Sequence, residues 1–225
     1  MAYSSPVSLC FDLDGTLVDT APDLIRVLNI VLAEEGLAET AYEAARKSVG
    51  YGARRLIIEA CERAAHRLSD SRLDALQSLF LKIYAEDIAQ LSYPYPGVFT
   101  TLTALKANGA RLSVCTNKPG FLARPLLDTL GMTHFFERII GSDDTARKKP
   151  HPDHIYDAAG HKGRHPILMI GDSAPDILAA KNADIPSILM RYGYSNSPPE
   201  RLGATHILRH FRDIPACIET ILERR

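Results

Sequence analysis

The sequence lacks a long apolar run, which bears first on where the protein could reside. No apolar stretch approaches the roughly 18 residues that a membrane-spanning helix requires. The apolar segment 7–11 is too short for the core of a secretory signal peptide, and it runs directly into Asp12 and Asp14. We therefore expect a soluble, cytoplasmic protein with no membrane partner.

The sequence also lacks paired cysteines and an excess of charge of either sign. The four cysteines stand singly, without a Cys-x-x-Cys pair, at Cys10, Cys61, Cys115 and Cys217. Scattered cysteines of this kind are typical of buried thiols in a reducing compartment. Lys and Arg number 26 and Asp and Glu number 27, for a net charge of -1. This balance argues against nucleic acid as a partner, but it allows a small anionic substrate bound by a local positive cluster.

Two glycine-rich nucleotide-binding motifs are absent as well. No segment matches the P-loop pattern. Gly50 and Gly52 lie in a glycine-containing stretch, but Arg55 occupies the position of the last glycine that a dinucleotide-binding motif requires, and no strand precedes it. The sequence therefore predicts no nucleotide binding through either motif.

What the sequence does contain is an alternation of short apolar segments with amphipathic ones. Segments typical of strands occupy 7–11, 110–115, 138–140, 167–170, 187–190 and 206–208. Segments with helical spacing of apolar residues occupy 98–108, 121–130, 153–159, 176–183 and 212–225. Strands that alternate with helices pair in parallel, so the predicted fold class is α/β, with a doubly wound, Rossmann-like parallel sheet.

Residues 20–93 interrupt this alternation with a helical block that contains no convincing strand. Its first helix is predicted to begin with Thr20 and Asp23 as a capping box. Two prolines and a glycine within 94–97 mark a linker after its last helix. We therefore expect an α/β core domain made of residues 1–19 and 94–225, with a small all-helical domain, residues 20–93, inserted into it.

Polar side chains follow four of the predicted strands, at the point where each strand ends. In chain order they are Asp12 and Asp14, Thr116 and Asn117, Lys148 and Lys149, and Asp172 and Asp176. Each of them alone could be an ordinary turn or cap residue. Because ligands of an open parallel sheet bind beyond the carboxyl ends of its strands, we expect these groups to meet at one edge. Carboxylates, a hydroxyl, an amide and lysines together suit a phosphate group and a hard divalent cation.

The same residues match motifs of a known family, and the match spans nearly the whole chain. Residues 11–16 are FDLDGT, 114–118 are VCTNK, 148–151 are KKPH and 171–176 are GDSAPD. In this order, each after a predicted strand, they resemble the four motifs of the haloacid dehalogenase superfamily. The helical block 20–93 resembles the small cap that closes over the active site in that superfamily.

The resemblance assigns the two aspartates of the first motif to catalysis. It implies that Asp12 attacks phosphorus and forms an aspartyl phosphate. It implies that Asp14 protonates the leaving alcohol and then activates water. Dehalogenase members lack the second aspartate, so Asp14 favours phosphate ester chemistry and an enzyme that is a phosphoric monoester hydrolase.

The resemblance also implies a phosphate-binding set and Mg2+ as cofactor. The phosphoryl oxygens would be bound by Thr116, Asn117 and Lys149, with Lys148 as the alternative lysine. The magnesium ion would be held by Asp12, Asp14 through its backbone carbonyl, Asp172 and Asp176.

The substrate implied by the resemblance is a small phosphorylated metabolite. The chain is most similar to the phosphoglycolate phosphatase subgroup, partly through the sequence YGY at 192–194, and this implies 2-phosphoglycolate. In the cap, Gly50 and Gly52 would allow close approach of the backbone to the substrate, and Arg54 or Arg55 could bind its carboxylate. Phosphatases of sugar phosphates or pyrophosphate share most of these features, and a monomer and a homodimer are both compatible with the sequence.

Several other functions stay open at this point. A phosphomutase on the same scaffold would return the phosphoryl group to a sugar. A phosphonate hydrolase would need a cap lysine for a Schiff base, for which Lys47 and Lys82 are candidates. His151 and His154 could form half of a zinc site, although no cysteines lie nearby. A catalytically inactive fold used as a binding module is the alternative from another class.

Three positions depart from the pattern of the resembled family. Ala174 and Pro175 replace polar residues that could support a metal ligand. Asp184 stands where glycine is common, at a turn that calls for a left-handed backbone, which Asp tolerates better than most residues. None of the three replaces a residue that the resemblance assigns to chemistry.

Overall fold

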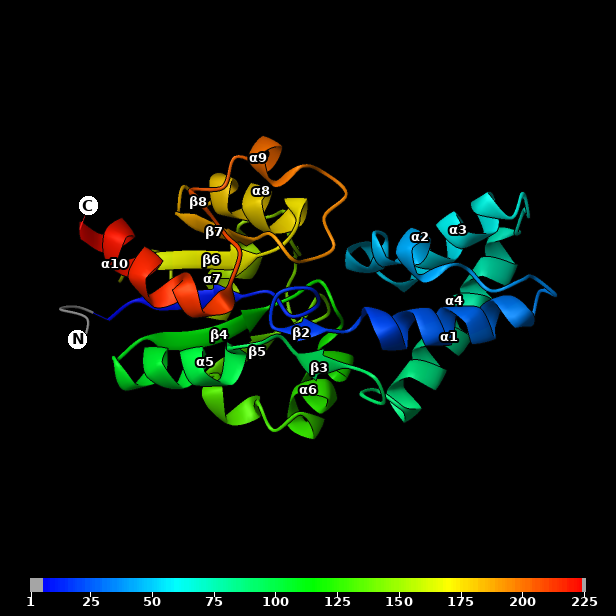
Figure 1. The fold of residues 1–225 in the computed structure, drawn as a ribbon, viewed down its shortest axis with the longest axis horizontal. Helices are drawn as coiled ribbons and strands as arrows, with labels where there is room; N and C mark the ends of the chain where they lie inside the picture. The colour runs from blue at the N-terminus through cyan, green and yellow to red at the C-terminus, as the bar shows by residue number, and fades with distance from the viewer. Residues whose placement is uncertain (1–5, 224–225) are drawn as a thin grey trace.

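The structure, a computed structural model, describes residues 6–223. Its core is a six-stranded sheet in the order β5-β4-β1-β6-β7-β8, and every neighbouring pair of strands is parallel (Figure 1). The strands are β1 (Ser8–Phe11), β4 (Arg111–Cys115), β5 (Arg138–Ile140), β6 (Ile167–Gly171), β7 (Ser187–Met190) and β8 (His206–Leu208). The predicted α/β class with a doubly wound parallel sheet is confirmed.

Helices cover both faces of this sheet because side chains alternate across it. In β1, Leu9 and Phe11 pack into one apolar cluster, whereas Cys10 packs into another. The cluster of Cys10 includes residues of α7 (Asp153–Ala159) and α8 (Ala174–Asn182). The cluster of Leu9 includes residues of α5 (Val98–Ala107), α6 (Gly120–Thr129) and α10 (Ile214–Glu223). The sheet is therefore buried between two layers of helices.

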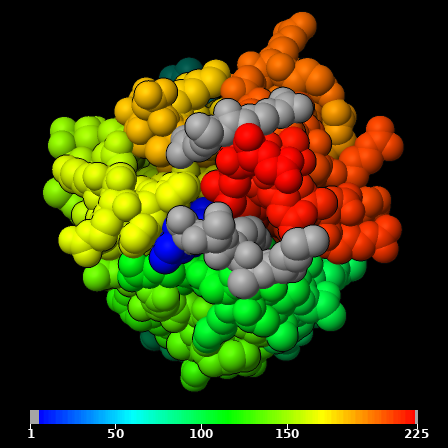
Figure 2. Space-filling model, turned by 90° about the vertical axis from the view of Figure 1, so that its left-hand side faces the viewer, coloured from blue at the N-terminus to red at the C-terminus, as the bar shows by residue number. Residues whose placement is uncertain are grey.

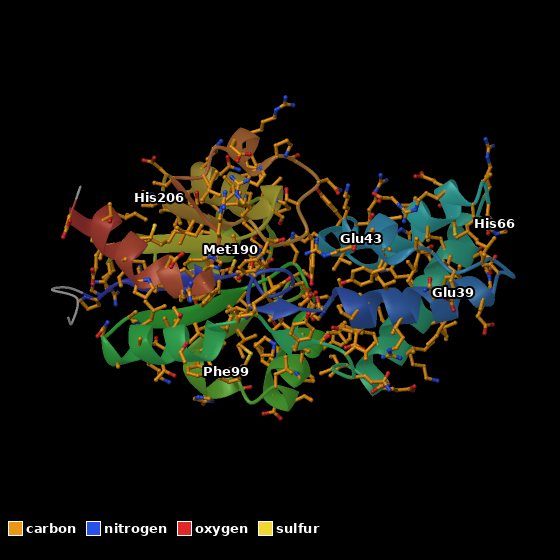
Figure 3. The ribbon with its side chains drawn as sticks, viewed as in Figure 1. Glu39, Glu43, His66, Phe99, Met190 and His206 are labelled. Atoms are coloured by element: carbon orange, nitrogen blue, oxygen red, sulfur yellow. The ribbon has the colours of Figure 1, made fainter. Side chains whose placement is uncertain are left out.

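Four helices form a second body beyond one end of the sheet, and we call them the cap (Figure 1). They are α1 (Ala21–Ala33), α2 (Tyr42–Arg46), α3 (Ala53–Arg63) and α4 (Asp70–Glu86), with a short 3-10 turn, η1 (Val49–Tyr51). Glu39 and His66 mark the part of the cap far from the sheet, whereas Phe99 and His206 lie on the core (Figure 3). Figure 2 views the opposite end, where α10 lies in front and the core hides nearly all of the cap.

Two short strands that the sequence did not predict lie where the cap joins the core. β2 (Val18–Asp19) pairs antiparallel with β3 (Tyr93–Pro94). Each strand has two residues, and β3 contains a proline, which has no N–H to donate. No alternation of side chains can identify strands this short. The pairing places the two connections between cap and core side by side.

The predicted capping box at the start of α1 is wrong. Thr20 is the N-cap residue, but its side chain makes no capping hydrogen bond, and its buried hydroxyl has no partner among the described residues. Asp23 instead accepts hydrogen bonds from the backbone N–H groups of Leu91 and Ser92, at 2.9 and 2.8 Å. Its carboxylate is used by the chain returning from α4, a long-range contact that local spacing cannot show.

Other local expectations hold. All four cysteines are free and buried. Asp184, just after α8, has a φ of 54°, which is the left-handed conformation expected there. The single-turn helix α9 (Pro199–Leu202) was not predicted, because one turn shows no period. Within residues 6–223, no helix has both the length and the apolar character needed to cross a membrane.

Candidate active site

The strand order brings the ends of β1, β4 and β6 together at the edge of the sheet that faces the cap. Asp12 directly follows β1, and its backbone N–H donates to the carbonyl of Ile170 in β6 at 2.8 Å. Thr116 directly follows β4, and its N–H donates to the carbonyl of Ile140 in β5 at 3.1 Å. The sheet thus fixes the backbone beneath both side chains. Asp12 and Thr116 are 8% and 1% exposed.

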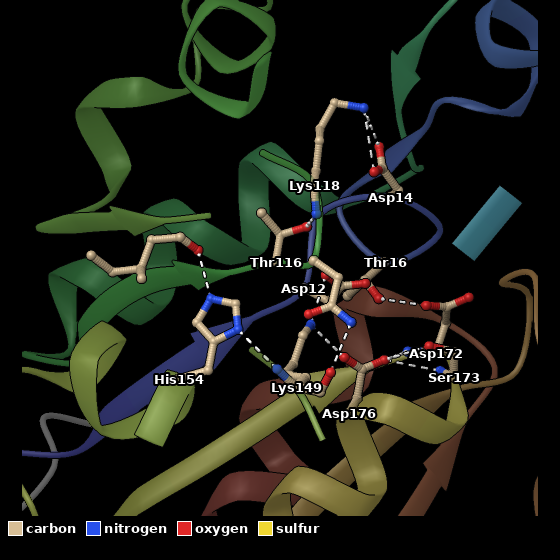
Figure 4. A network of polar contacts seen from close by, with 12 residues as sticks. Asp12, Asp14, Thr16, Thr116, Lys118, Lys149, His154, Asp172, Ser173 and Asp176 are labelled. Atoms are coloured by element: carbon tan, nitrogen blue, oxygen red, sulfur yellow. Dashed lines mark hydrogen bonds and ion pairs between the residues drawn. The ribbon is translucent and has the colours of Figure 1, made fainter. Parts of the chain in front are cut away.

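Lys149 lies at the centre of this edge, between two carboxylates (Figure 4). Its Nζ donates to Oδ1 of Asp12 at 2.9 Å and to Oδ1 of Asp176 at 2.6 Å. Burial alone would lower the pKa of Lys149, but the two carboxylates raise it above its usual range. Lys149 is therefore a permanent cation, while Lys148 next to it is exposed to solvent.

Three carboxylates form a buried acidic cluster around this lysine. One carboxylate oxygen from each of Asp12, Asp172 and Asp176 lies within 4.8 Å of the other two. Burial raises the pKa of Asp12 to about 6, and the neighbouring Asp176 adds to the rise, although Lys149 opposes it. Burial raises the pKa of Asp172 well above its usual range, and the neighbouring carboxylates of Asp176 and Asp12 add to the rise. One ammonium does not balance the charge of three carboxylates. Carboxylate oxygens are the ligands that a hard divalent cation prefers, so the cluster could hold such a cation.

The start of α8 positions two of these carboxylates. Oδ2 of Asp176 accepts hydrogen bonds from the N–H groups of Asp172 and Ser173, at 3.2 and 3.0 Å, and from the Ser173 hydroxyl at 2.9 Å. Ser173 and Asp176 form a capping box for this helix. Pro175 stands in its first turn, where the missing N–H removes no helical hydrogen bond. The departures at Ala174 and Pro175 therefore leave this arrangement intact.

Asp14 does not belong to the acidic cluster, although it is only two residues from Asp12. Its carboxylate oxygens accept hydrogen bonds from Nζ of Lys118, at 3.2 and 3.3 Å. The N–H of Lys118 in turn donates to the Thr116 hydroxyl at 3.2 Å. Lys118 lies within the second motif, but the sequence alone predicts no role for it. Its position two residues after Thr116 was the available indication.

His154 fixes the backbone that carries Lys149. Its Nδ1 accepts a hydrogen bond from the N–H of Lys149 at 3.2 Å, so the proton lies on Nε2, which is 3.1 Å from the carbonyl oxygen of Ile140. Burial and the nearby Lys149 ammonium lower the pKa of His154 to about 4. The hypothesis of a zinc half-site is wrong, because both ring nitrogens are used and Nδ1 of His151 accepts from the N–H of Asp153. Asn117 supports the same loop, since its Nδ2 donates to the carbonyl of Lys149 at 3.1 Å.

Tyr194, in the loop after β7, connects the acidic cluster to the cap. Its N–H donates to Oδ2 of Asp172 at 2.6 Å, and its hydroxyl donates to Oδ1 of Asp19 at 2.6 Å. The same hydroxyl accepts from the N–H groups of Thr20 and Ala21, at 2.8 and 3.0 Å. A Cβ on Gly193 would lie 2.2 Å from the Cβ of Asp172, so only glycine permits this approach. The sequence YGY at 192–194 thus has a structural basis.

A cavity of about 240 Å³ lies between this edge of the sheet and the cap. Asp12, Asp14, Thr116, Asn117, Lys118, Lys148, Lys149 and Asp176 line it from the core. Gly50 and Gly52 line it from the cap, together with the apolar or aromatic side chains of Leu24, Leu56, Phe80 and Tyr84. Its volume suits a small metabolite rather than a macromolecule.

Four cap residues with candidate roles do not reach this cavity. Arg54 pairs with Asp74, and Nε of Arg55 is 2.6 Å from a carboxylate oxygen of Glu59. Lys47 and Lys82 are exposed, and neither lines the cavity. The structure therefore does not bring the predicted arginines to the site, and it offers no cap lysine for a Schiff base in residues 6–223.

Comparisons with known proteins agree with this geometry. The chain is 42% identical to a phosphoglycolate phosphatase of Caulobacter vibrioides over 96% of its own length and 92% of that protein. It is 41% identical to a phosphoglycolate phosphatase of Agrobacterium fabrum, over 98% and 95% of the two chains. The crystal structure of a predicted phosphoglycolate phosphatase from Haemophilus somnus superposes with a TM-score of 0.86 at 34% identity, covering 93% of this chain and 96% of that one.

A family model confirms the resemblance noted from the motifs. The model for haloacid dehalogenase-like hydrolases matches residues 9–190, which include all four motifs and the cap. With this match and with relatives above 40% identity over nearly the full length, this chain belongs to the haloacid dehalogenase-like hydrolases.

Proposed function

We propose that this protein is a Mg2+-dependent phosphatase that hydrolyses 2-phosphoglycolate, or a closely similar small phosphate monoester, through an aspartyl phosphate on Asp12. The observation that carries the proposal is that the two aspartates of one loop have different neighbours. Asp12 lies in the acidic cluster beside Lys149, whereas Asp14 lies outside that cluster and pairs with Lys118. The two carboxylates of one loop therefore face different groups of the site and can take two separate roles.

In the first half of the reaction, a carboxylate oxygen of Asp12 attacks phosphorus and the P–O bond to the alcohol breaks. Asp14 gives a proton to the departing oxygen, which leaves as a neutral alcohol. Lys149 and the Thr116 hydroxyl bind the oxygens of the transferring phosphoryl group. The negative charge on these oxygens makes such cationic and polar contacts the main source of catalysis.

In the second half, water attacks the phosphorus of the aspartyl phosphate. Asp14, now deprotonated, accepts a proton from this water, and the bond to Asp12 breaks. This step releases phosphate, restores the Asp12 carboxylate and returns Asp14 to its protonated form. Asp12, Asp172, Asp176 and the backbone carbonyl of Asp14 would hold the Mg2+ ion. When bound, this ion supplies positive charge that lets two anions approach each other.

The substrate assignment is supported by the relatives and by the cavity. The relatives in Caulobacter and Agrobacterium bear the name phosphoglycolate phosphatase. The volume of about 240 Å³ suits a molecule of this size. The cap over the cavity keeps bulk water from the aspartyl phosphate before the alcohol has left.

The test is phosphate release from a panel containing 2-phosphoglycolate, sugar phosphates and pyrophosphate, with Mg2+ or with EDTA. We expect release that needs Mg2+, is fastest with 2-phosphoglycolate and is abolished in Asp12→Asn. Lys82→Met, an exposed cap lysine outside the cavity, serves as the matched control and should behave like the wild type. Isomerised sugar phosphate with little free phosphate would instead indicate a phosphomutase, and no turnover of any compound would favour an inactive binding module.

A further inference from the structure

The mechanism proposed above uses Lys149 but leaves a second buried lysine of the same cavity without a role. The side chain of Lys118 is 4% exposed, and its Nζ lies 3.2 Å from a carboxylate oxygen of Asp14. From the cap, the ring of Tyr84 covers this ammonium, with 4.4 Å between Nζ and the ring centroid. The ammonium is thus enclosed between a carboxylate of the core and an aromatic ring of the cap.

Lys118 is the buried cation nearest to where the leaving group must lie. Three lysines and no arginine line the cavity within the described chain, and all three come from the core. Lys149 is held by Asp12 and Asp176 on the phosphoryl side, and Lys148 is exposed. The cap opposite Lys118 contributes mainly apolar and aromatic side chains, so it offers no competing charge.

Tyr84, which also lines the cavity, has a hydroxyl without a hydrogen-bond partner in the described chain. The Tyr84 hydroxyl is buried there, and the Lys118 ammonium lies over the ring of the same residue. Burial raises the pKa of Tyr84 to about 12, so the phenol keeps its proton and can donate it in a hydrogen bond. An unpaired buried hydroxyl costs free energy that a ligand with an acceptor oxygen would recover.

We propose that Lys118, assisted by the Tyr84 hydroxyl, binds a carboxylate of the leaving group and thereby selects short phosphorylated hydroxy acids. This inference rests on the proposed phosphatase function. Asp14 must contact the ester oxygen to protonate it, and Lys118 contacts Asp14. A carboxylate one methylene beyond that oxygen therefore falls within reach of the same ammonium. Lys118 takes the role predicted from the sequence for Arg54 or Arg55.

A simpler role for Lys118 would be to orient Asp14 alone, and a pair of substrates separates the two roles. Ethyl phosphate has the two-carbon chain of 2-phosphoglycolate but carries a methyl group in place of the carboxylate. A lysine that only orients Asp14 affects both substrates equally. A lysine that binds the carboxylate affects 2-phosphoglycolate far more.

The experiment measures kcat/KM for both substrates in the wild type and in Lys118→Met, Tyr84→Phe and Lys82→Met, with a melting curve for each protein. The wild type should prefer 2-phosphoglycolate, and Lys118→Met should reduce that preference about 10- to 100-fold, as expected for a hydrogen bond to a charged group. Tyr84→Phe should reduce it by about 3- to 10-fold, as expected for an uncharged donor. Lys82→Met should leave it unchanged.

Equal losses on both substrates in Lys118→Met, or no loss on either, would overturn the inference, as would a wild type without preference for 2-phosphoglycolate. If Lys118→Met does not fold, Tyr84→Phe is the test: a larger loss on 2-phosphoglycolate than on ethyl phosphate supports the inference, and equal losses overturn it. A wild type that hydrolyses no phosphate ester at all would refute the underlying phosphatase function, and this result is recognisable without any variant.

Discussion

At the scale of single residues, two aspartates of one loop have different neighbours and therefore different chemistry. Asp12 shares its surroundings with Asp172, Asp176 and Lys149, and burial raises its pKa to about 6. Asp14 pairs with Lys118 instead. Both residues lie in the loop after β1, and a glycine with a φ of 84° follows Asp14 and redirects the chain there.

Lys149 should be needed for stability as well as for catalysis. Lys149→Met leaves three buried carboxylates without an ammonium, and we expect it to lower the free energy of unfolding by about 3 kcal/mol in EDTA. Added Mg2+ should raise the melting temperature of Lys149→Met more than that of the wild type, because the ion then supplies the only local positive charge. Thermal unfolding with EDTA and with MgCl2 measures both effects.

The matched control for this prediction is Lys162→Met. Lys162 is 73% exposed and lies 3.8 Å from Asp153, so its loss should change stability by at most about 0.5 kcal/mol. Equal melting temperatures of Lys149→Met and the wild type in EDTA would contradict the prediction.

His154 should make the fold less stable in mild acid. Its pKa is about 4 in the folded protein and about 6.5 in the unfolded chain. Between these values the unfolded state binds a proton that the folded state does not, so stability falls as the pH drops from 6.5 towards 4. The loss between pH 7 and pH 5 is about 2 kcal/mol.

Denaturant unfolding of the wild type and of His154→Gln at both pH values tests this prediction. The raised pKa of Asp12 has the opposite effect over the same range, since the folded state then binds the extra proton. Both proteins contain Asp12, so the difference between them isolates the histidine. A difference that does not change with pH would show that His154 is not held neutral.

At the scale of elements, the loop after β7 is the connection between the acidic cluster and the cap. One residue of this loop, Tyr194, binds Asp172 through its N–H and binds Asp19, Thr20 and Ala21 through its hydroxyl. The loop therefore couples the start of α1 to a carboxylate that could hold the metal.

Tyr194→Phe should destabilise the protein and slow turnover. The change leaves the N–H groups of Thr20 and Ala21 without an acceptor in a buried place, which costs about 1–3 kcal/mol for each. Tyr93→Phe is the control, because its hydroxyl contacts the same Asp19 at 3.3 Å but the residue is 53% exposed, so a small effect is expected. Denaturant unfolding and kcat measured for both variants test this prediction. Equal losses of unfolding free energy in Tyr194→Phe and Tyr93→Phe would contradict it.

At the scale of the whole molecule, the cavity exists only because the cap lies over the edge of the sheet. Chain segments far apart in sequence line it, from Asp12 to Asp176 in the core and from Leu24 to Tyr84 in the cap. The pairing of β2 with β3 holds the two chain segments that connect the core and the cap side by side. An arrangement of this kind favours small molecules over a folded protein as substrates.

Phosphoproteins should therefore be poor substrates. We expect kcat/KM for a phosphoserine peptide of ten or more residues to be at least about 100-fold below that for 2-phosphoglycolate, because the peptide would have to hold the cap away from the site. Parallel assays of phosphate release from both compounds measure the ratio. Comparable rates would show that the cap does not restrict access.

Prediction from the sequence worked where the pattern is local and repeated. Segments such as 187–190 and 206–208 were placed correctly, because a run of apolar residues bounded by polar ones is enough to identify a buried strand. The two-residue strands β2 and β3 were not predicted, and Asp23 was predicted to form a capping box at the start of a helix. Both the strand pairing and the contacts of Asp23 depend on a partner about 70 residues away. The role of His154 could not be predicted for the same reason, since its contacts with the backbone of Lys149 and Ile140 exist only after folding.

The sequence by itself determined the parallel sheet, the helical insertion and the membership of the family, because these depend on period, order and motif spacing along the chain. Only the tertiary structure decided which charges meet. It paired Lys149 with Asp12 and Asp176, gave Asp14 to Lys118, and turned Arg54 away from the cavity to Asp74. The reason is physical: a charge acts over a few ångströms in space, and the distance between two side chains is set by the packing of the whole fold.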